Sequence, residues 1–281
     1  MATVVILSAG DIGGATARQL AATDLVSRIV LVDDLAGVAS GKALDVAQSA
    51  PVDGYHTALA GSNDVAAVVG AAVVVIADRA AGSAEWQGDE ALALLKRVAG
   101  LNQAAPLLCA GASQAGLIEK LVTEAGVSPA RVFGSAPEAL RSAVVAITAL
   151  EANAAPVDVS LSVLGKPPHQ VIVPWDEAAI SGRSATNVLS AAQLARLDAR
   201  IARLWPPGPY ALAAAATHLI RSALTRSPRV HAAMVAAVRD EGAPGRAAMR
   251  PVTLNTTGIA TLVEPALSAR DRVRFDTAMR A

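Results

Sequence analysis

The sequence predicts an α/β protein that begins with a doubly wound parallel sheet and continues as a mixed α+β region. Short runs rich in valine, isoleucine and leucine alternate with stretches of helix length through the first half of the chain. These runs are apolar throughout, which is typical of strands buried on both faces of a parallel sheet. From residue 156 onward the order changes, because strands follow strands and helices follow helices, as in α+β folds.

Each predicted strand of the first half leads into a predicted helix, so the segments form repeated strand-helix units. In order, strands and helices are expected at residues 3–7, 12–22, 28–32, 39–50, 73–77, 85–102, 106–110, 114–125 and 131–133, with a further helix after Pro137.

The second half is expected to contain a strand pair, two long helices, three further strands and a last helix. The last helix starts at Ser268, and Asp271 three positions later forms an approximate capping box. We place the domain boundary between residues 144 and 145, which divides the chain into domains 1–144 and 145–281. The other segments are strands at 157–164 and 170–174, helices at 191–204 and 210–224, and strands at 229–238, 250–255 and 259–263.

Charge and aromatic content argue against a nucleic-acid partner. The 24 basic and 24 acidic residues cancel, and aromatic residues make up only 2% of the chain. A nucleic-acid binder usually shows a basic surface or aromatic stacking platforms.

The chain offers no candidate for a membrane span or a secretion signal. Its apolar run at residues 65–77 is too short to cross a bilayer, so we expect no membrane partner and a cytoplasmic location. The single cysteine, Cys109, excludes a disulfide framework and is expected to pack as a small buried residue. Since hydrophobic residues reach 53%, a homo-oligomer interface is a reasonable hypothesis.

A glycine-containing turn follows the first predicted strand. It reads Ser8-Ala9-Gly10-Asp11-Ile12-Gly13, a G-x-G-x-x-G pattern with serine in the first glycine position. In this pattern the second glycine (Gly10) allows the backbone to approach a pyrophosphate, and the third (Gly13) allows the helix to pack on the strand. The first helical amides, around Asp11 and Ile12, would bind the phosphates.

An acidic residue stands at the end of the second predicted strand, twenty positions after Gly13. This residue, Asp33, can accept hydrogen bonds from the adenosine ribose of a dinucleotide. Because Asp34 follows it, a 2′-phosphate would be repelled, which favours NAD over NADP. The alternative is that the glycines only close a tight turn in a fold that has lost its cofactor.

In these motifs and in further segments, the chain resembles the lactate/malate dehydrogenase family over nearly its whole length. The resemblance implies a Rossmann-type first domain, a substrate domain in the second half, NAD as cofactor, and hydride transfer between NAD and a small 2-hydroxy acid. The matching segments lie at residues 30–45, 73–77, 134–143, 163–165, 208–211 and 258–268.

The same resemblance shows departures at the positions that carry the family's chemistry. Val144 stands where the family has the arginine that holds the substrate carboxylate, and Arg141 stands where it has the aspartate that orients the catalytic histidine. The histidine itself comes two positions late, as His169. The candidate catalytic pair is His169 with Glu138, in which Glu138 would replace the missing aspartate. The alternative, which the position of His169 at the start of a strand favours, is a solvent-facing or packing residue.

Two arginines are candidates for binding an anion near the cleft. Arg79 lies in the segment that follows the strand at 73–77, and Arg141 lies in the helix after Pro137. The alternative for both is an ordinary surface role. His56, His218 and His231 show no metal-ligand or catalytic spacing and are interpreted as structural, so no metal is predicted.

Three hypotheses on function stay open. The chain is an NAD-dependent dehydrogenase with a remodelled site and a small-molecule substrate, a non-catalytic relative that binds NAD or another nucleotide as a sensor or structural subunit, or a protein that keeps only the fold and serves in assembly.

Overall fold

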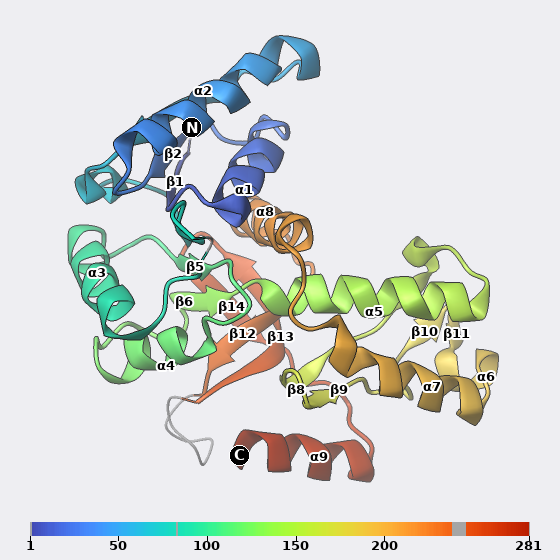
Figure 1. The fold of residues 1–281 in the computed structure, drawn as a ribbon. Coiled ribbons are helices and arrows are strands. Elements are labelled where there is room, and N and C mark those ends of the chain that lie inside the picture. Colours follow the sequence, from blue (N-terminus) through green and yellow to red (C-terminus); the bar gives the residue numbers. More distant parts are fainter. Residues whose placement is uncertain (1, 83, 238–245, 281) are drawn as a thin grey trace.

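The computed structural model of the protein describes residues 2–82, 84–237 and 246–280 (Figure 1). Within these residues, eleven strands form one sheet that runs through most of the molecule. Its first six strands are parallel and follow the order β3-β2-β1-β4-β5-β6. This is the strand order of doubly wound dinucleotide-binding folds, so the predicted fold class is confirmed. The six strands are β1 (Thr3–Leu7), β2 (Arg28–Val32), β3 (Ala58–Ser62), β4 (Val73–Ile76), β5 (Leu107–Cys109) and β6 (Val132–Gly134).

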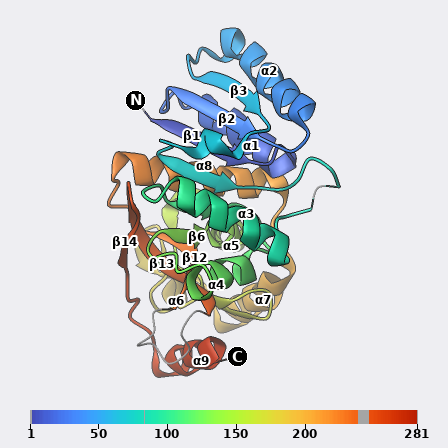
Figure 2. The ribbon, with the colours of Figure 1, turned by 90° about the vertical axis from the view of Figure 1, so that its left-hand side faces the viewer.

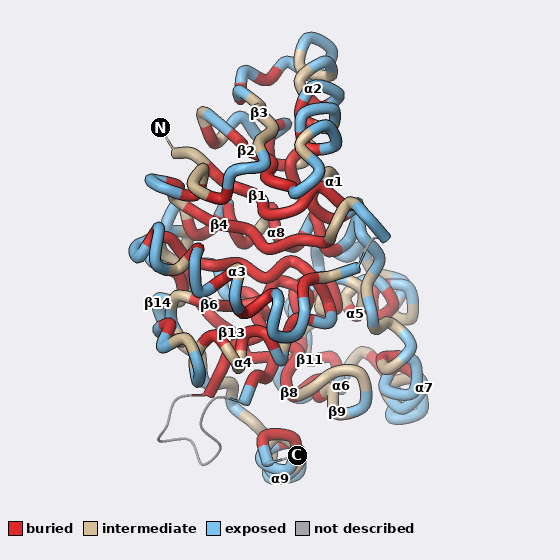
Figure 3. The backbone as a smooth tube through the Cα atoms, turned by 60° about the vertical axis from the view of Figure 1, so that its left-hand side comes forward, coloured by how far each residue is buried: buried red, intermediate tan, exposed pale blue. Residues whose placement is uncertain are grey.

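Helices cover both faces of this parallel half, which explains why its strands are apolar on both sides. On β1, Val5 and Leu7 pack into the cluster that includes α3 and α4, whereas Val4 and Ile6 pack into the cluster that includes α1, α2 and α8. Figures 1 and 2 show these helices on opposite sides of the sheet, and in Figure 3 the buried residues follow the strands between them. The helices are α1 (Asp11–Ala21), α2 (Ala36–Asp53), α3 (Gly88–Leu101), α4 (Ala115–Thr123), α5 (Ala136–Ala152) and α8 (Pro209–Thr225).

The second half extends the same sheet with antiparallel strands. Strand β12 (His231–Ala236) runs antiparallel to β6 and brings Met234 opposite Gly134, and β13 (Ala247–Asn255) follows it. The predicted boundary at residues 144 and 145 falls inside α5. The remaining elements are β7 (Val159–Ser160), β8 (Leu164–Lys166), β9 (Gln170–Ile172), β10 (Ala179–Ile180), β11 (Arg183–Ser184), α6 (Ala185–Val188), α7 (Ala191–Ile201), β14 (Gly258–Leu262) and α9 (Ala269–Arg280), with short 3₁₀ turns at Val65–Val68, Pro156–Asp158 and Ala202–Leu204.

The structure differs from the predicted segments in several places. Strands β3, β10 and β11 and helix α6 have no predicted counterpart; the sequence of β3, Ala-Leu-Ala-Gly-Ser, lacks β-branched residues, and the strand lies at the sheet edge. The single strand expected at 157–164 is divided into a 3₁₀ turn, β7 and the start of β8. Val238, the expected end of the strand that became β12, lies outside the described residues.

Within the described residues no helix combines the length and the apolar character needed to span a bilayer. Cys109 is fully buried in β5, as expected for a small apolar residue.

Candidate functional site

The turn between β1 and α1 keeps its glycine-like shape although it starts with a serine. Ser8 has φ +78°, a left-handed conformation that glycine adopts without strain. Its hydroxyl accepts a 2.7 Å hydrogen bond from the indole nitrogen of Trp86. Gly13 is required for close packing of helix on strand, because a Cβ there would lie 2.3 Å from the carbonyl oxygen of Ser8.

The amides at the start of α1 are bound by a side chain of the protein itself. The Oδ2 atom of Asp78 accepts a hydrogen bond of 2.8 Å from Asp11 N, and its Oδ1 atom accepts bonds of 2.9 and 3.1 Å from Ile12 N and Gly13 N. The carboxylate is buried, and a Cβ on Gly10 would lie 2.4 Å from its Cγ. A helix N-terminus of this kind is an anion site, and here Asp78 occupies it.

A second carboxylate from the same loop is bound to backbone amides after β5. Glu85 accepts hydrogen bonds of 2.8 Å from Ala112 N and 2.6 Å from Ser113 N. Its carboxylate also fills the space beside Gly111, where a Cβ would lie 2.3 Å away. The loop between β4 and α3 is therefore anchored at the carboxyl ends of both neighbouring strands.

The predicted anion-binding residue Arg79 belongs to this loop. Its guanidinium lies 3.9 Å from the ring centroid of Trp86 and pairs with Glu90 at 2.5 Å. Arg79 therefore contacts Trp86 within the loop and Glu90 in the first turn of α3.

The predicted ribose-binding carboxylate lies where the sequence places it. Asp33 is buried just after β2, and its Oδ2 and Oδ1 atoms accept hydrogen bonds from Ala9 N (2.9 Å) and Leu35 N (3.0 Å). These bonds hold the carboxylate against the turn that contains Gly10. Lys42, on α2, donates a 2.6 Å bond to the carbonyl of Gly10.

A second polar cluster is centred on Glu138 in the first turn of α5. Arg141 binds its carboxylate through two hydrogen bonds, from Nε to Oε2 at 3.0 Å and from Nη2 to Oε1 at 2.6 Å, and Ala232 N donates to Oε2 at 2.9 Å. Burial by itself raises the pKa of Glu138. The contacts with His231, Arg141 and the Ala232 amide lower it by a larger amount, so the pKa of Glu138 lies well below its usual range. Glu138 is therefore a buried carboxylate.

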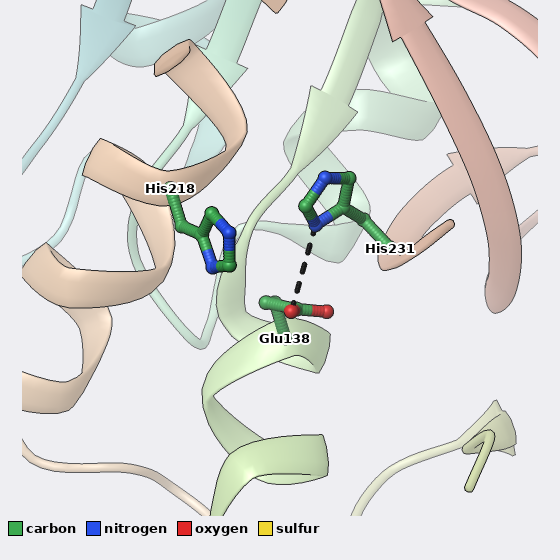
Figure 4. A group of neighbouring side chains, drawn as sticks. All are labelled: Glu138, His218 and His231. Carbon is green, nitrogen blue, oxygen red and sulfur yellow. Dashed lines mark ion pairs between the residues drawn. The ribbon is translucent and has the colours of Figure 1, made fainter. Parts of the chain in front are cut away.

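Two histidines complete this cluster (Figure 4). His231 is fully buried at the start of β12, with Nδ1 3.5 Å from Glu138 Oε1 and Nε2 2.7 Å from the hydroxyl of Ser222. His218, on α8, places its ring edge-on to His231 with centroids 5.0 Å apart. Burial, followed by the charges of His231 and Arg229, lowers the pKa of His218, and the charge of Glu138 opposes this shift in part.

Two cavities adjoin the cluster. One of about 420 Å³ is lined by Glu138, Arg141, His218 and Arg229 among others, and one of about 380 Å³ is lined by Arg141, Arg229 and His231. Arginines 141 and 229 thus border both spaces.

The predicted pair of Glu138 and His169 is not brought together. His169 is exposed in the turn between β8 and β9, and among the described interactions the partners of Glu138 are Arg141, Ala232 and His231. The roles of His218 and His231 could not be predicted from local sequence patterns, because the two residues follow Glu138 by 80 and 93 positions. The antiparallel pairing of β12 with β6 is what brings His231 to α5.

The chain is similar to known proteins both in sequence and in fold. No protein-family profile matches the chain. The malate dehydrogenase of Thioalkalivibrio sulfidiphilus is 29% identical over 299 residues, covering 99% of this chain and 96% of that protein, and the malate dehydrogenase of Thermomicrobium roseum is 26% identical over 294 residues, covering 99% and 95%.

Among solved structures, the malate dehydrogenase of Aeropyrum pernix superimposes with a TM-score of 0.88 at 18% identity, covering 99% of this chain and 95% of that one. The lactate dehydrogenase of Cryptosporidium parvum, solved with lactic acid and NAD, has a TM-score of 0.87 at 19% identity and the same coverage. The solved structures show that the fold is shared. The similarity in sequence to malate dehydrogenases over nearly the whole chain supports its membership in the lactate/malate dehydrogenase family.

Proposed function

We propose that the chain is a non-catalytic relative of the malate/lactate dehydrogenases in which NAD binding competes with the side chain of Asp78. The observation that carries this proposal is the set of three hydrogen bonds from α1 amides to Asp78. These amides cannot donate to a pyrophosphate and to the carboxylate at once, and two anions at one helix terminus repel each other.

NAD is the cofactor that the relatives support, since the lactate dehydrogenase among the structural neighbours is complexed with it. The position of Asp33 after β2 fits the adenosine ribose, and Gly13 fits the close helix packing of the motif. The pyrophosphate position does not fit while Asp78 and the neighbouring loop hold the amides. We therefore derive no chemical step through NAD.

The positions expected to bind a 2-hydroxy acid also favour a non-catalytic role. Val144 is fully buried in the core, and Arg141 is engaged by Glu138. His169, which comes two positions after the place of the family's catalytic histidine, is exposed. A substrate carboxylate would lack the bidentate arginine of the family at its usual position.

The competing proposal is an NAD-dependent dehydrogenase with a rebuilt site. The pair of Glu138 and His231 favours it, because a carboxylate that orients a histidine next to arginines is a common acid/base arrangement. In that case His231, and not His169, would exchange the proton.

The deciding experiment titrates the purified chain with NADH by fluorescence and then measures NADH oxidation with pyruvate and oxaloacetate. Saturable binding without turnover is the expected result. Turnover would overturn the non-catalytic proposal, and His231→Asn and His169→Ala would then identify the base. If neither the natural chain nor Asp78→Asn binds NADH, the NAD proposal fails and only assembly remains.

We further propose that the protein is a cytoplasmic homo-oligomer. Helix α2 and the residue before it expose the apolar side chains of Leu35, Val38, Leu44 and Val52. Exposed apolar side chains on one element are typical of a subunit interface. Light scattering coupled to size exclusion measures the oligomeric state, and a monomer at all concentrations would contradict the proposal.

A further inference from the structure

We propose that Glu138, His218 and His231 form a binding site for one divalent transition-metal ion, of which Zn²⁺ is the best match. One ligand atom from each of the three residues lies within 4.8 Å of the other two. They come from α5, α8 and β12, and their side chains converge on one point (Figure 4).

The Nδ1 atom of His231, which faces the Glu138 carboxylate without a hydrogen bond among the described residues, is the strongest indication of a ligand. The His231 side chain is fully buried, and its Nε2 atom is bonded to Ser222. A buried nitrogen that lies 3.5 Å from a carboxylate calls for a positive partner, either a proton or a metal ion. If Nε2 carries the proton and donates it to Ser222, the lone pair of Nδ1 faces Glu138 and is available to a cation.

The surroundings of the three residues match those of known metal ligands. Metal-binding histidines usually donate their second ring nitrogen to a fixed partner, as His231 can to Ser222. Ligating carboxylates are in turn held by hydrogen bonds, and Arg141 and the Ala232 amide hold Glu138 in this way.

The ligand types select among metal ions. Two imidazole nitrogens and one carboxylate oxygen suit Zn²⁺, Co²⁺ or Ni²⁺, whereas Mg²⁺ and Ca²⁺ prefer oxygen ligands alone. His218 and Glu138 line the cavity of about 420 Å³, through which an ion can enter and in which a water can complete a tetrahedral shell.

Two cations limit the affinity of this site. Arg141 is bonded to Glu138, and Arg229 lines the same cavity. Their charges repel a divalent ion, so we expect binding weaker than at a dedicated structural zinc site.

The test is calorimetric titration of the chelator-treated full chain with Zn²⁺, repeated with Co²⁺ so that its visible absorption reports the ligand geometry. We expect one ion per chain and a loss of affinity of about tenfold or more in His218→Ala and in Glu138→Gln. The matched controls are His56→Ala and His169→Ala, because these are the chain's other two histidines and both are exposed. The controls should bind as the natural chain does.

His218→Ala is the decisive variant, because the residue is only partly buried and its loss leaves the bonds between Glu138 and Arg141 in place. Circular dichroism verifies that each variant is folded. The proposal is overturned if the natural chain binds no Zn²⁺, if His218→Ala binds it unchanged, or if binding disappears with His56 or His169. This outcome is distinguishable from that of the NADH titration, since among the described residues no hydrogen bond or ion pair joins the three ligands to the turn between β1 and α1.

Discussion

The indole nitrogen of Trp86 donates a 2.7 Å hydrogen bond to the hydroxyl of Ser8, and this bond joins the loop after β4 to the turn after β1. Both residues are buried. The hydroxyl explains why a serine can stand where the motif has glycine, because it supplies the acceptor that the buried indole nitrogen needs. The serine carries backbone strain at this position, because its φ of +78° is a left-handed conformation.

We expect Ser8→Ala to destabilise the protein more than Ser8→Gly. Both changes leave the Trp86 donor buried without its acceptor, which costs about 1–3 kcal/mol. Glycine also relieves the left-handed strain, which is worth about 1 kcal/mol. Urea unfolding measures the two free energies, and equal losses would show that the backbone at Ser8 is unstrained.

Neutralising Asp78 should exchange stability for cofactor affinity. In Asp78→Asn the three α1 amides lose a charged acceptor, and each such bond contributes about 1.5–3 kcal/mol, so thermal stability should fall. The same amides become available to a pyrophosphate, and NADH should bind about tenfold more tightly or better.

Fluorescence titration with NADH and thermal unfolding measure both effects. Asp64→Asn is the matched control, since Asp64 also accepts a backbone amide but does so at the exposed start of a 3₁₀ turn. Unchanged or weaker NADH binding by Asp78→Asn would contradict the role of Asp78 as a competitor.

Local sequence patterns predict the parallel half of the fold well, because each strand there is a continuous apolar run. Strands β1 and β2 begin and end as expected, and the position of Asp33 follows from the end of β2. Strand β3 could not be predicted, since it is held by pairing with β2 and by contact with α2 and has no apolar pattern of its own.

The candidate sites depend on contacts between distant segments. Asp78 follows β4 and meets α1 because β4 pairs with β1 in parallel, so the carboxyl ends of both strands share one edge. That relationship was accessible from the predicted strand order. The meeting of Glu138 with His218 and His231 was not, because it requires the antiparallel addition of β12 next to β6.

Cys109 should resist thiol reagents while the protein is folded. Burial, together with the smaller effect of the Glu85 charge, raises the pKa of its thiol to about 12. A raised thiol pKa lowers the thiolate fraction, which at pH 8 becomes about one in ten thousand. An aromatic disulfide reagent, which releases a yellow thiolate when it reacts with a thiol, should therefore detect one thiol per chain in urea and none in buffer. Rapid reaction of the folded chain would show that β5 opens to solvent.

A pair of glycine substitutions on and beside α2 tests the close approach of this helix to the sheet edge. A Cβ on Gly61 would lie 2.3 Å from the backbone nitrogen of Ser40, so Gly61→Ala must push α2 away from β3 and should cost about 1–3 kcal/mol or more. Gly41 lies within α2 and has nothing within 4 Å of its Cβ position, so Gly41→Ala should stabilise the protein by about 0.5–1 kcal/mol.

Urea unfolding of the two variants gives both free energies from the same kind of substitution. Opposite signs are expected because one methyl group enters a closed contact and the other enters solvent while improving helix propensity. If Gly61→Ala were neutral, α2 would not be held tightly on β3, and the exposed apolar side chains of α2 could no longer be assigned to a fixed interface.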